Sequence, residues 1–309
     1  MSGEQRLRSA TAADASALAD LWASAFMPPL APDQWLVDEE RFAHTIVAED
    51  GAGLCGSIYG LPKRLRESGG RVADVHCIGS VAVAARARGE GLARRLVAAT
   101  LDGARGADWA LLFTGTPDVY RSSGFEGFTM QRTIAGPWGA SPAEVGRGLQ
   151  VSRETVSPGA LGRLSEVYEG SREGRVSLAP VRSTRDWAMA EVRLAGGQLY
   201  LLAEGAQIVG YAIARIDGDT GVILEMAALP AADSIGVHRE LLSAVAADWA
   251  AAGVIACDIA VPRGEGVDHI FRVFAPEAVR QDDRTGMIRP LRRAQRLHGV
   301  RHLTEADYF

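Results

Sequence analysis

A short segment rich in arginine and glycine is the part of the sequence best suited to chemistry. Arg86-Ala87-Arg88-Gly89-Glu90-Gly91 follows an apolar, strand-like run and precedes a stretch with helical apolar periodicity. Glycines let a backbone approach an anion closely, and the amides and dipole of a helix N-terminus attract negative charge. The two arginines could add charge-assisted hydrogen bonds. The segment therefore predicts a pyrophosphate site, although the same residues could also form a plain turn with solvated arginines.

The elements that must position this segment follow a recognisable order. A Thr-x-x-Asp capping pattern at 11–14 starts a helix with an apolar stripe that runs to Phe26. Apolar runs between turn residues predict three meandering strands at 44–49, 53–61 and 72–84. A second helix begins at the glycine segment, and 109–114 is a further buried strand. This order predicts a mixed α/β (α+β) domain with a mostly antiparallel central sheet flanked by helices.

The second half of the chain repeats this order. Strands are predicted at 199–203, 207–215 and 221–229, followed by a helix at 235–251 and a strand at 254–261. The pattern breaks near 135–139, and the stretch to about residue 174 is interpreted as a linker with one or two helices. The 309 residues are enough for two hydrophobic cores. We therefore predict two tandem domains, 1–140 and 141–309, related by duplication.

Four segments resemble the GNAT acetyltransferase superfamily in order and spacing. They are Leu7-Arg8-x-Ala10-Thr11-x-x-Asp14, the strand 78–83, the Arg-x-x-Gly-x-Gly loop, and Tyr120-Arg121-Ser122-Ser123-Gly124-Phe125. The resemblance covers about residues 5–135, and the second half looks like a degenerate copy. A tandem pair with an intact first copy is similar to the enhanced-intracellular-survival (Eis) type of aminoglycoside acetyltransferase. The length of the chain predicts no counterpart of that type's third domain.

The resemblance implies how an acyl-CoA co-substrate, acetyl-CoA or another, would be held. The strand before the glycine loop would splay from its neighbour, and the main-chain groups of Val81 and Val83 would bind pantetheine and polarise the thioester carbonyl. The amides from Arg88 through Glu90 to Gly91, with the side chains of Arg86 and Arg88, would hold the pyrophosphate. The first domain would therefore carry the acyl-CoA site.

Two side chains are candidates for proton transfer. By the resemblance, Tyr120 would protonate the departing thiolate, which a phenol can do within hydrogen-bond reach; its alternative is to pack on Phe125. His76 lies on the strand leading to Val81 and has an ordinary pKa that suits a general base. An isolated histidine on an apolar strand is, however, more often structural. In Eis-type relatives the terminal carboxylate is proposed as a base, and the sequence leaves open whether Phe309 takes that role.

The composition of the chain favours some classes of binding partner and one cellular compartment over others. The net charge of −5 weakly disfavours nucleic acid and leaves room for a cationic or amine-bearing substrate. No apolar run approaches 18 residues and no signal peptide is evident, so we expect a cytoplasmic protein that does not bind membranes. Three cysteines without a Cys-x-x-Cys pattern predict buried thiols and no metal site.

The sequence thus predicts an acyl-CoA-dependent N-acetyltransferase acting on a primary amine of a small molecule, such as an amino sugar, antibiotic or polyamine. The second domain, which lacks the glycine loop, is expected to shape the acceptor pocket. Two alternatives stay open: acylation of a peptide or protein amine, and a non-catalytic acyl-CoA-binding sensor. Candidate acceptor contacts are the apolar side chains of Phe26, Met27 and Trp35, with the acidic residues Asp33, Asp38, Glu39 and Glu40 as partners for a cationic acceptor; the alternative is a packed loop with solvated acids. The acyl chain length is not fixed, and a homodimer is compatible with the sequence.

Overall fold

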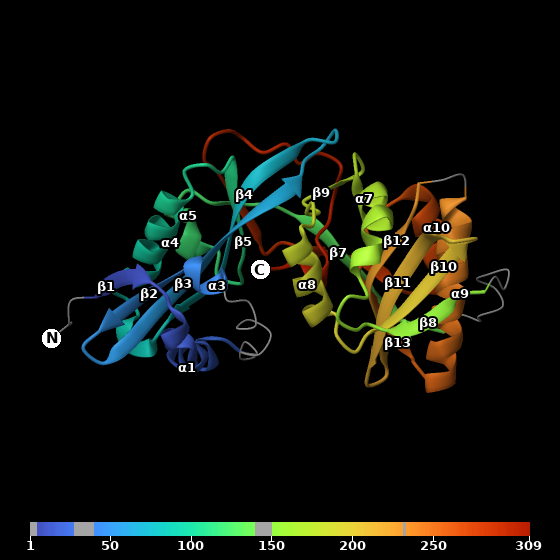
Figure 1. The fold of residues 1–309 in the computed structure, drawn as a ribbon, viewed down its shortest axis with the longest axis horizontal. Coiled ribbons are helices and arrows are strands. Elements are labelled where there is room, and N and C mark those ends of the chain that lie inside the picture. Colours follow the sequence, from blue (N-terminus) through green and yellow to red (C-terminus); the bar gives the residue numbers. More distant parts are fainter. Residues whose placement is uncertain (1–4, 28–39, 140–149, 231–232) are drawn as a thin grey trace.

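Two seven-stranded, mostly antiparallel sheets with helices on their faces make up the protein, whose structure is a computed structural model (Figure 1). The structure describes residues 5–27, 40–139, 150–230 and 233–309. The two sheets lie side by side along the long axis of the molecule. The predicted mixed α/β fold class, with two sheet domains in tandem, is confirmed.

The first sheet has the strand order β1-β2-β3-β4-β5-β15-β6. Its strands are β1 (Arg6–Ser9), β2 (Thr45–Asp50), β3 (Gly53–Arg66), β4 (Val72–Val83), β5 (Trp109–Phe113), β15 (Gly286–Pro290) and β6 (Glu126–Gly127). The accompanying helices are α1 (Ala15–Ala25), α3 (Glu40–Ala43), α4 (Leu92–Gly103) and α5 (Asp118–Arg121). Strands β4 and β5 run parallel because α4 connects them as a crossover.

The second sheet has the order β14-β7-β13-β12-β11-β10-β8. Its strands are β14 (Val279–Asp283), β7 (Met130–Pro137), β13 (Ala256–Ile259), β12 (Thr220–Ala228), β11 (Gln207–Asp217), β10 (Gln198–Glu204) and β8 (Ser152–Thr155). Its helices are α7 (Ser165–Arg172), α8 (Thr184–Arg193), α9 (Ser234–Ala252) and α10 (Glu265–Phe274); β9 (Val176–Ser177) pairs separately with β16 (Val300–Arg301). The meander β10–β12, helix α9 and parallel strand β13 repeat the order of β2–β4, α4 and β5, as predicted.

The two halves exchange strands. Strand β7, from the first half of the chain, pairs with β13 and β14 in the second sheet, and β15, near the end, pairs with β5 in the first. The predicted division at residue 140 therefore does not coincide with the division between the sheets. The expected break at 135–139 is wrong in part, because β7 continues to Pro137 and Trp138 packs on Trp249 and Phe274. The partners of β7 lie far along the chain, so no local pattern revealed it.

Local sequence signals explain the first helix and its seat on the sheet. The Thr11 amide donates to Asp14 Oδ2 (2.8 Å) in the predicted capping box, and α1 follows. Leu18, Leu21 and Trp22 bury the apolar stripe of α1. Trp22 Nε1 donates to Ser57 Oγ in β3 at 3.0 Å, which satisfies the buried indole N–H and ties the helix to the strand.

Strand β3 extends past its predicted end at residue 61 to Arg66. Its last residues, with the start of β4, form an arm that reaches toward the second half (Figure 1). Leu65 bridges to Pro180 and packs in a shared core with Leu178. The polar run after residue 61 obscured this strand in the sequence.

The three cysteines, Cys55, Cys77 and Cys257, are buried free thiols, as predicted. Within the described ranges, no helix is long and apolar enough to cross a bilayer. The same ranges hold no group of three or more histidine, cysteine or acidic side chains that could share a metal ion.

Candidate functional site

The glycine loop lies directly between β4 and α4, where the sequence predicted it. Gly89 and Gly91 have φ angles of 83° and 76°. These values lie in the left-handed region, which residues with a Cβ adopt only with strain. Gly91 is the N-cap of α4, and the first helical bond there runs from Arg95 N to Gly91 O (3.1 Å). The amides of the first helical turn have no acceptor within the helix. This cradle of amides with the positive end of the helix dipole suits an anion.

The two arginines of the loop make hydrogen bonds that hold the loop and the neighbouring turn in place. Arg86 Nε donates to Asp50 Oδ2 (3.2 Å) and Arg86 Nη2 to the Leu54 carbonyl (2.9 Å), so this side chain fixes the β2–β3 turn beside the loop. Arg88 Nε donates to the Val83 carbonyl at 3.1 Å. Both guanidinium groups are thus engaged with the protein, and Arg86 forms an ion pair with Asp50. Their predicted contact with pyrophosphate stays a prediction.

Strand β4 leaves β5 before the glycine loop. The two strands pair from Val75↔Trp109 to Ile78↔Leu112, whereas β4 continues to Val83 paired with β3. Residues 79–83 of β4 therefore have no β5 partner, and their main-chain groups face an opening in the sheet. This is the splay that the resemblance implied for the strand carrying Val81 and Val83. The carbonyl of Val83 already accepts from Arg88, so Val81 offers the less engaged backbone.

A β-bulge marks the point of divergence. Ser57 pairs with Ala82 and Tyr59 with Gly79, so Ser80 and Val81 together face a single residue of β3. Ser80 has a φ of 49°, a strained value for a residue with a side chain.

Arg41, a buried residue of α3, stabilises the bulge. Its Nη2 donates to Ser80 Oγ (2.7 Å), and its guanidinium lies 4.0 Å from the centre of the Tyr59 ring. Sequence reasoning missed Arg41; an arginine amid apolar residues just before a strand was the available signal.

Tyr120 lies on α5, in the same apolar cluster as the opening. The cluster also includes Ala82 and Leu112, with Val81 and Val83 packed against it. The Tyr120 ring meets Phe125 edge-on, with centroids 6.3 Å apart, so the packing alternative also holds. Burial raises the pKa of Tyr120 to about 12, and the Thr114 hydroxyl acts in the opposite direction. The phenol is therefore a proton donor throughout the physiological range.

The last residues of the sequence reach the opposite side of the bulge. A Cβ built on Gly79 would lie 2.5 Å from the main-chain oxygen of Phe309, so Gly79 leaves room for this group. Phe309 and Tyr308 pack their rings on Phe113, with centroids 5.8 and 4.8 Å away. The structure thus places the main-chain oxygen of Phe309 against the strand that carries the opening, a contact that the sequence left open.

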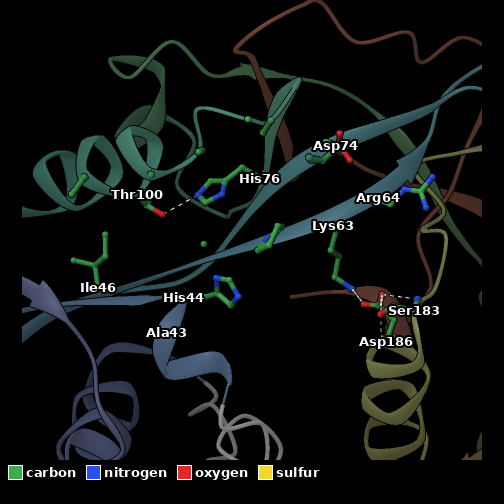
Figure 2. A pocket seen from close by; sticks show the side chains of 18 of the residues that line it. Ala43, His44, Ile46, Lys63, Arg64, Asp74, His76, Thr100, Ser183 and Asp186 are labelled. Carbon is green, nitrogen blue, oxygen red and sulfur yellow. Dashed lines mark hydrogen bonds and ion pairs between the residues drawn. The ribbon is translucent and has the colours of Figure 1, made fainter.

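His76 lies elsewhere. Its Nε2 is 2.9 Å from Thr100 Oγ1 on α4, and it lines a cavity of about 660 Å³ that also holds His44 and the Lys63–Asp186 ion pair (Figure 2). None of the described residues lining this cavity belongs to the glycine loop, to 79–83 or to α5. The structure therefore places Tyr120 in the apolar cluster against which Val81 and Val83 pack, and places His76 in a separate cavity. Its predicted role as a base stays a prediction.

Replacing His76 by glutamine is expected to make the free energy of unfolding fall less steeply as the pH is lowered below 6.5. Burial lowers the pKa of His76 to about 4, so between pH 6.5 and 4 the unfolded chain binds the proton that the folded chain rejects. The contribution of His76 to the free energy of unfolding is therefore fully present above pH 6.5, and about 3 kcal/mol of it is lost as the pH falls to 4. Urea unfolding at pH 7 and 4.5 should show a smaller loss in His76→Gln than in wild type, with the exposed His298→Gln as the control. Equal losses would contradict the lowered pKa.

In the described part of the second half, the helix N-terminus that corresponds to the glycine loop is already occupied by a carboxylate of the chain. At the N-terminus of α9, Asp233 Oδ1 accepts from the Gly236 amide (2.8 Å). A carboxylate of the chain itself thus occupies the place that an anionic ligand would take. Of the candidate acceptor contacts, Phe26, Met27 and Glu40 are within the described ranges, and residues 28–39 lie outside them.

Comparisons with known proteins show which fold this chain shares. The family model described as acetyltransferase (GNAT) domain matches residues 6–128. A GCN5-related N-acetyltransferase from Kribbella flavida has a TM-score of 0.70 at 19% identity, covering 94% of this chain and 72% of that chain. Eis1 from Mycobacterium abscessus has a TM-score of 0.64 at 16% identity, covering 93% and 74%. A GCN5-related N-acetyltransferase from Sphaerobacter thermophilus has 0.53 at 16% identity, covering 96% and 98%. At such identities the likeness shows a shared fold. No curated protein matches the sequence.

Proposed function

We propose that this protein, whose residues 6–128 match the acetyltransferase (GNAT) domain model, transfers an acetyl group from acetyl-CoA to a primary amine of a small molecule. GNAT enzymes in general use an acyl-CoA co-substrate. The observation that carries the proposal is the divergence of β4 from β5 directly before a glycine loop that opens α4. That geometry offers free backbone for a pantetheine arm and helix amides for its pyrophosphate.

The proposed reaction is direct transfer. The amine nitrogen attacks the thioester carbon, the C–N bond forms, and the C–S bond breaks as the tetrahedral intermediate collapses. Tyr120 donates its phenolic proton to the departing thiolate, which a buried, protonated tyrosine supports. The closeness of the Phe309 main-chain oxygen to Gly79 supports a further proposed step, in which this oxygen accepts a hydrogen bond from the incoming amine. The amine proton then passes to solvent or to a base, and the Tyr120 phenolate regains a proton from solvent.

Acetyl-CoA turnover, read as thiol release across a panel of amino sugars, polyamines and short peptides, tests this proposal. Release that depends on a small amine supports it. Release only with peptide amines would favour a peptide or protein acyltransferase. Tight CoA binding without release for any amine would favour a sensor. Longer acyl-CoAs in the same assay report the preferred chain length.

Gly79→Ala is expected to lower kcat/KM for the amine by about 10- to 100-fold, because a displaced hydrogen-bond partner misplaces the reacting group. Its Cβ would overlap the Phe309 main-chain oxygen, so the tail must move. The affinity for CoA should stay within twofold of wild type. Gly127→Ala on β6, where a Cβ meets nothing within 4 Å, is the matched control. If Gly79→Ala turns over as wild type does, Phe309 has no part in the reaction.

A further inference from the structure

A buried charge cluster lies in the second half, next to the segment that reaches the first. Arg182 Nε donates to Asp307 Oδ1 (2.7 Å) and Arg182 Nη1 to Glu225 Oε1 (3.1 Å). Tyr211 donates its hydroxyl to Glu225 Oε1 at 2.6 Å. Thr304 Oγ1 donates to Asp307 Oδ2 at 2.8 Å. The arginine and both carboxylates are almost completely buried. The cluster therefore joins the segment just before α8, strands β11 and β12, and the last residues of the sequence, 304–309 (the tail).

Two aromatic rings pack against the arginine of the cluster. The Arg182 guanidinium lies 4.0 Å from the centre of the Tyr168 ring and 4.6 Å from that of Trp187. Burial by itself would raise the pKa of Asp307, but the charge and hydrogen bond of Arg182 outweigh it and hold the pKa below its ordinary value. Asp307 therefore stays ionised and paired at neutral pH. Such a pair fixes geometry because neither partner can leave without stranding a buried charge.

The tail passes directly from this cluster to the first half. Asp307 ends the short 3-10 helix Glu305–Asp307, which packs against α8, and two residues later Phe309 reaches Gly79. Between them Tyr308 donates its hydroxyl to Asp283 Oδ2 (3.3 Å) and packs its ring on Phe113. The last residues thus lie between the two sheets (Figure 1). Asp307 holds them to the second half, and Phe309, two residues later, contacts the first half.

We propose that Arg182 and Asp307 are positioning residues for acyl transfer: their ion pair fixes the tail so that the Phe309 main-chain oxygen stays against the β4 bulge. The second half would then act on the reaction through Tyr308 and Phe309, the two residues that follow Asp307. This inference rests on the proposed function for its kinetic consequence and on the contacts above for the anchoring.

Asp307→Asn tests the proposal, since it keeps the side-chain shape and removes the charge. We expect kcat to fall about tenfold, as a reacting group displaced by a fraction of an ångström would cause, with KM for acyl-CoA within twofold of wild type. Thr304→Val is the milder variant should Asp307→Asn fold poorly. It removes a hydroxyl that lies within hydrogen-bond distance of both Asp307 (2.8 Å) and Glu225 (3.0 Å). Unchanged kcat in a folded variant would overturn the proposal.

A double-mutant cycle with Gly79→Ala separates positioning from general destabilisation. Both changes act on the same Phe309 contact, so the double variant should be hardly slower than the slower single variant. If the double variant loses kcat by the product of the two single losses, the cluster acts by a route other than the Phe309 contact, and the proposal is overturned. Asp248→Asn is the matched control, because Asp248 pairs with Arg153 in the second half without contacting the tail. It should leave kcat unchanged.

Hydrogen exchange of the peptide 302–309, read by mass spectrometry, tests the anchoring without any turnover. Faster exchange in Asp307→Asn and Thr304→Val, with wild-type exchange in Asp248→Asn, is the expected result. If wild type releases no thiol with any amine but this pattern holds, the proposed function fails while the anchoring stands. If thiol is released normally and tail exchange is the same in all variants, the anchoring fails alone.

Discussion

Replacing Tyr120 by phenylalanine is expected to lower kcat at least about 100-fold, the usual scale for removing a general acid. The hydroxyl is the only atom lost, and the ring can still pack on Phe125. Without a proton the thiolate is a poor leaving group, so the tetrahedral intermediate returns to reactants. Thiol release at saturating acetyl-CoA and amine measures the effect. The dissociation constant for CoA should stay within twofold of wild type.

The pH dependence of wild type gives a second view of Tyr120. Its pKa of about 12 means that the phenol stays protonated across the assay range, so its ionisation causes no alkaline loss of kcat below about pH 11. Tyr200→Phe, at a buried tyrosine of the second half that donates to Asp248, is the matched control and should keep full activity. A Tyr120→Phe enzyme as fast as this control would remove Tyr120 from the mechanism.

Gly89→Asp is expected to raise the dissociation constant for CoA by about 100-fold or more, whereas Gly89→Asn should raise it only a few fold. Asparagine and aspartate have nearly the same shape, and both tolerate the left-handed φ of 83° better than other side chains. A Cβ at Gly89 meets nothing within 4 Å, so neither change disturbs packing. The difference between them therefore reports the charge of the bound group.

Calorimetric titration of both Gly89 variants with CoA, and with dephospho-CoA, measures this effect. Both variants should unfold at nearly the same temperature, which controls for strain in the loop. Equal affinities of the two variants for CoA would mean that the loop does not face a phosphate. A loss restricted to CoA, absent with dephospho-CoA, would assign the loop to the 3′-phosphate instead of the pyrophosphate.

The local sequence predicted most of the elements around the site. The capping pattern at Thr11, the glycine loop and the apolar stripe of α4 each fall within a few residues of the chain, so short-range rules suffice for them. The same rules revealed the repeat in the second half, because it reproduces a local order of strands and helix. Asp233 at the start of α9 was correctly read as part of a loop that lacks the glycines.

Long-range pairing decided the rest. Strand β7 and the end of β3 became strands through partners distant in sequence, and the exchange of β7 and β15 between the sheets left no local trace. His76 shows the same limit at the level of the site. Its position on β4 suggested a base, but which face of the strand it occupies depends on the packing of α4, and it lies against Thr100.

By itself, then, the sequence determined the fold class, the tandem repeat and the loop that prepares an anion site, because each depends on the identity and spacing of neighbouring residues. Only the tertiary structure decided that the tail reaches Gly79, that Arg41 stabilises the bulge, and that Arg182 with Asp307 fastens the end of the chain. These contacts join residues that the chain separates widely. Their energies come from burial and charge pairing, which exist only once both halves have folded together.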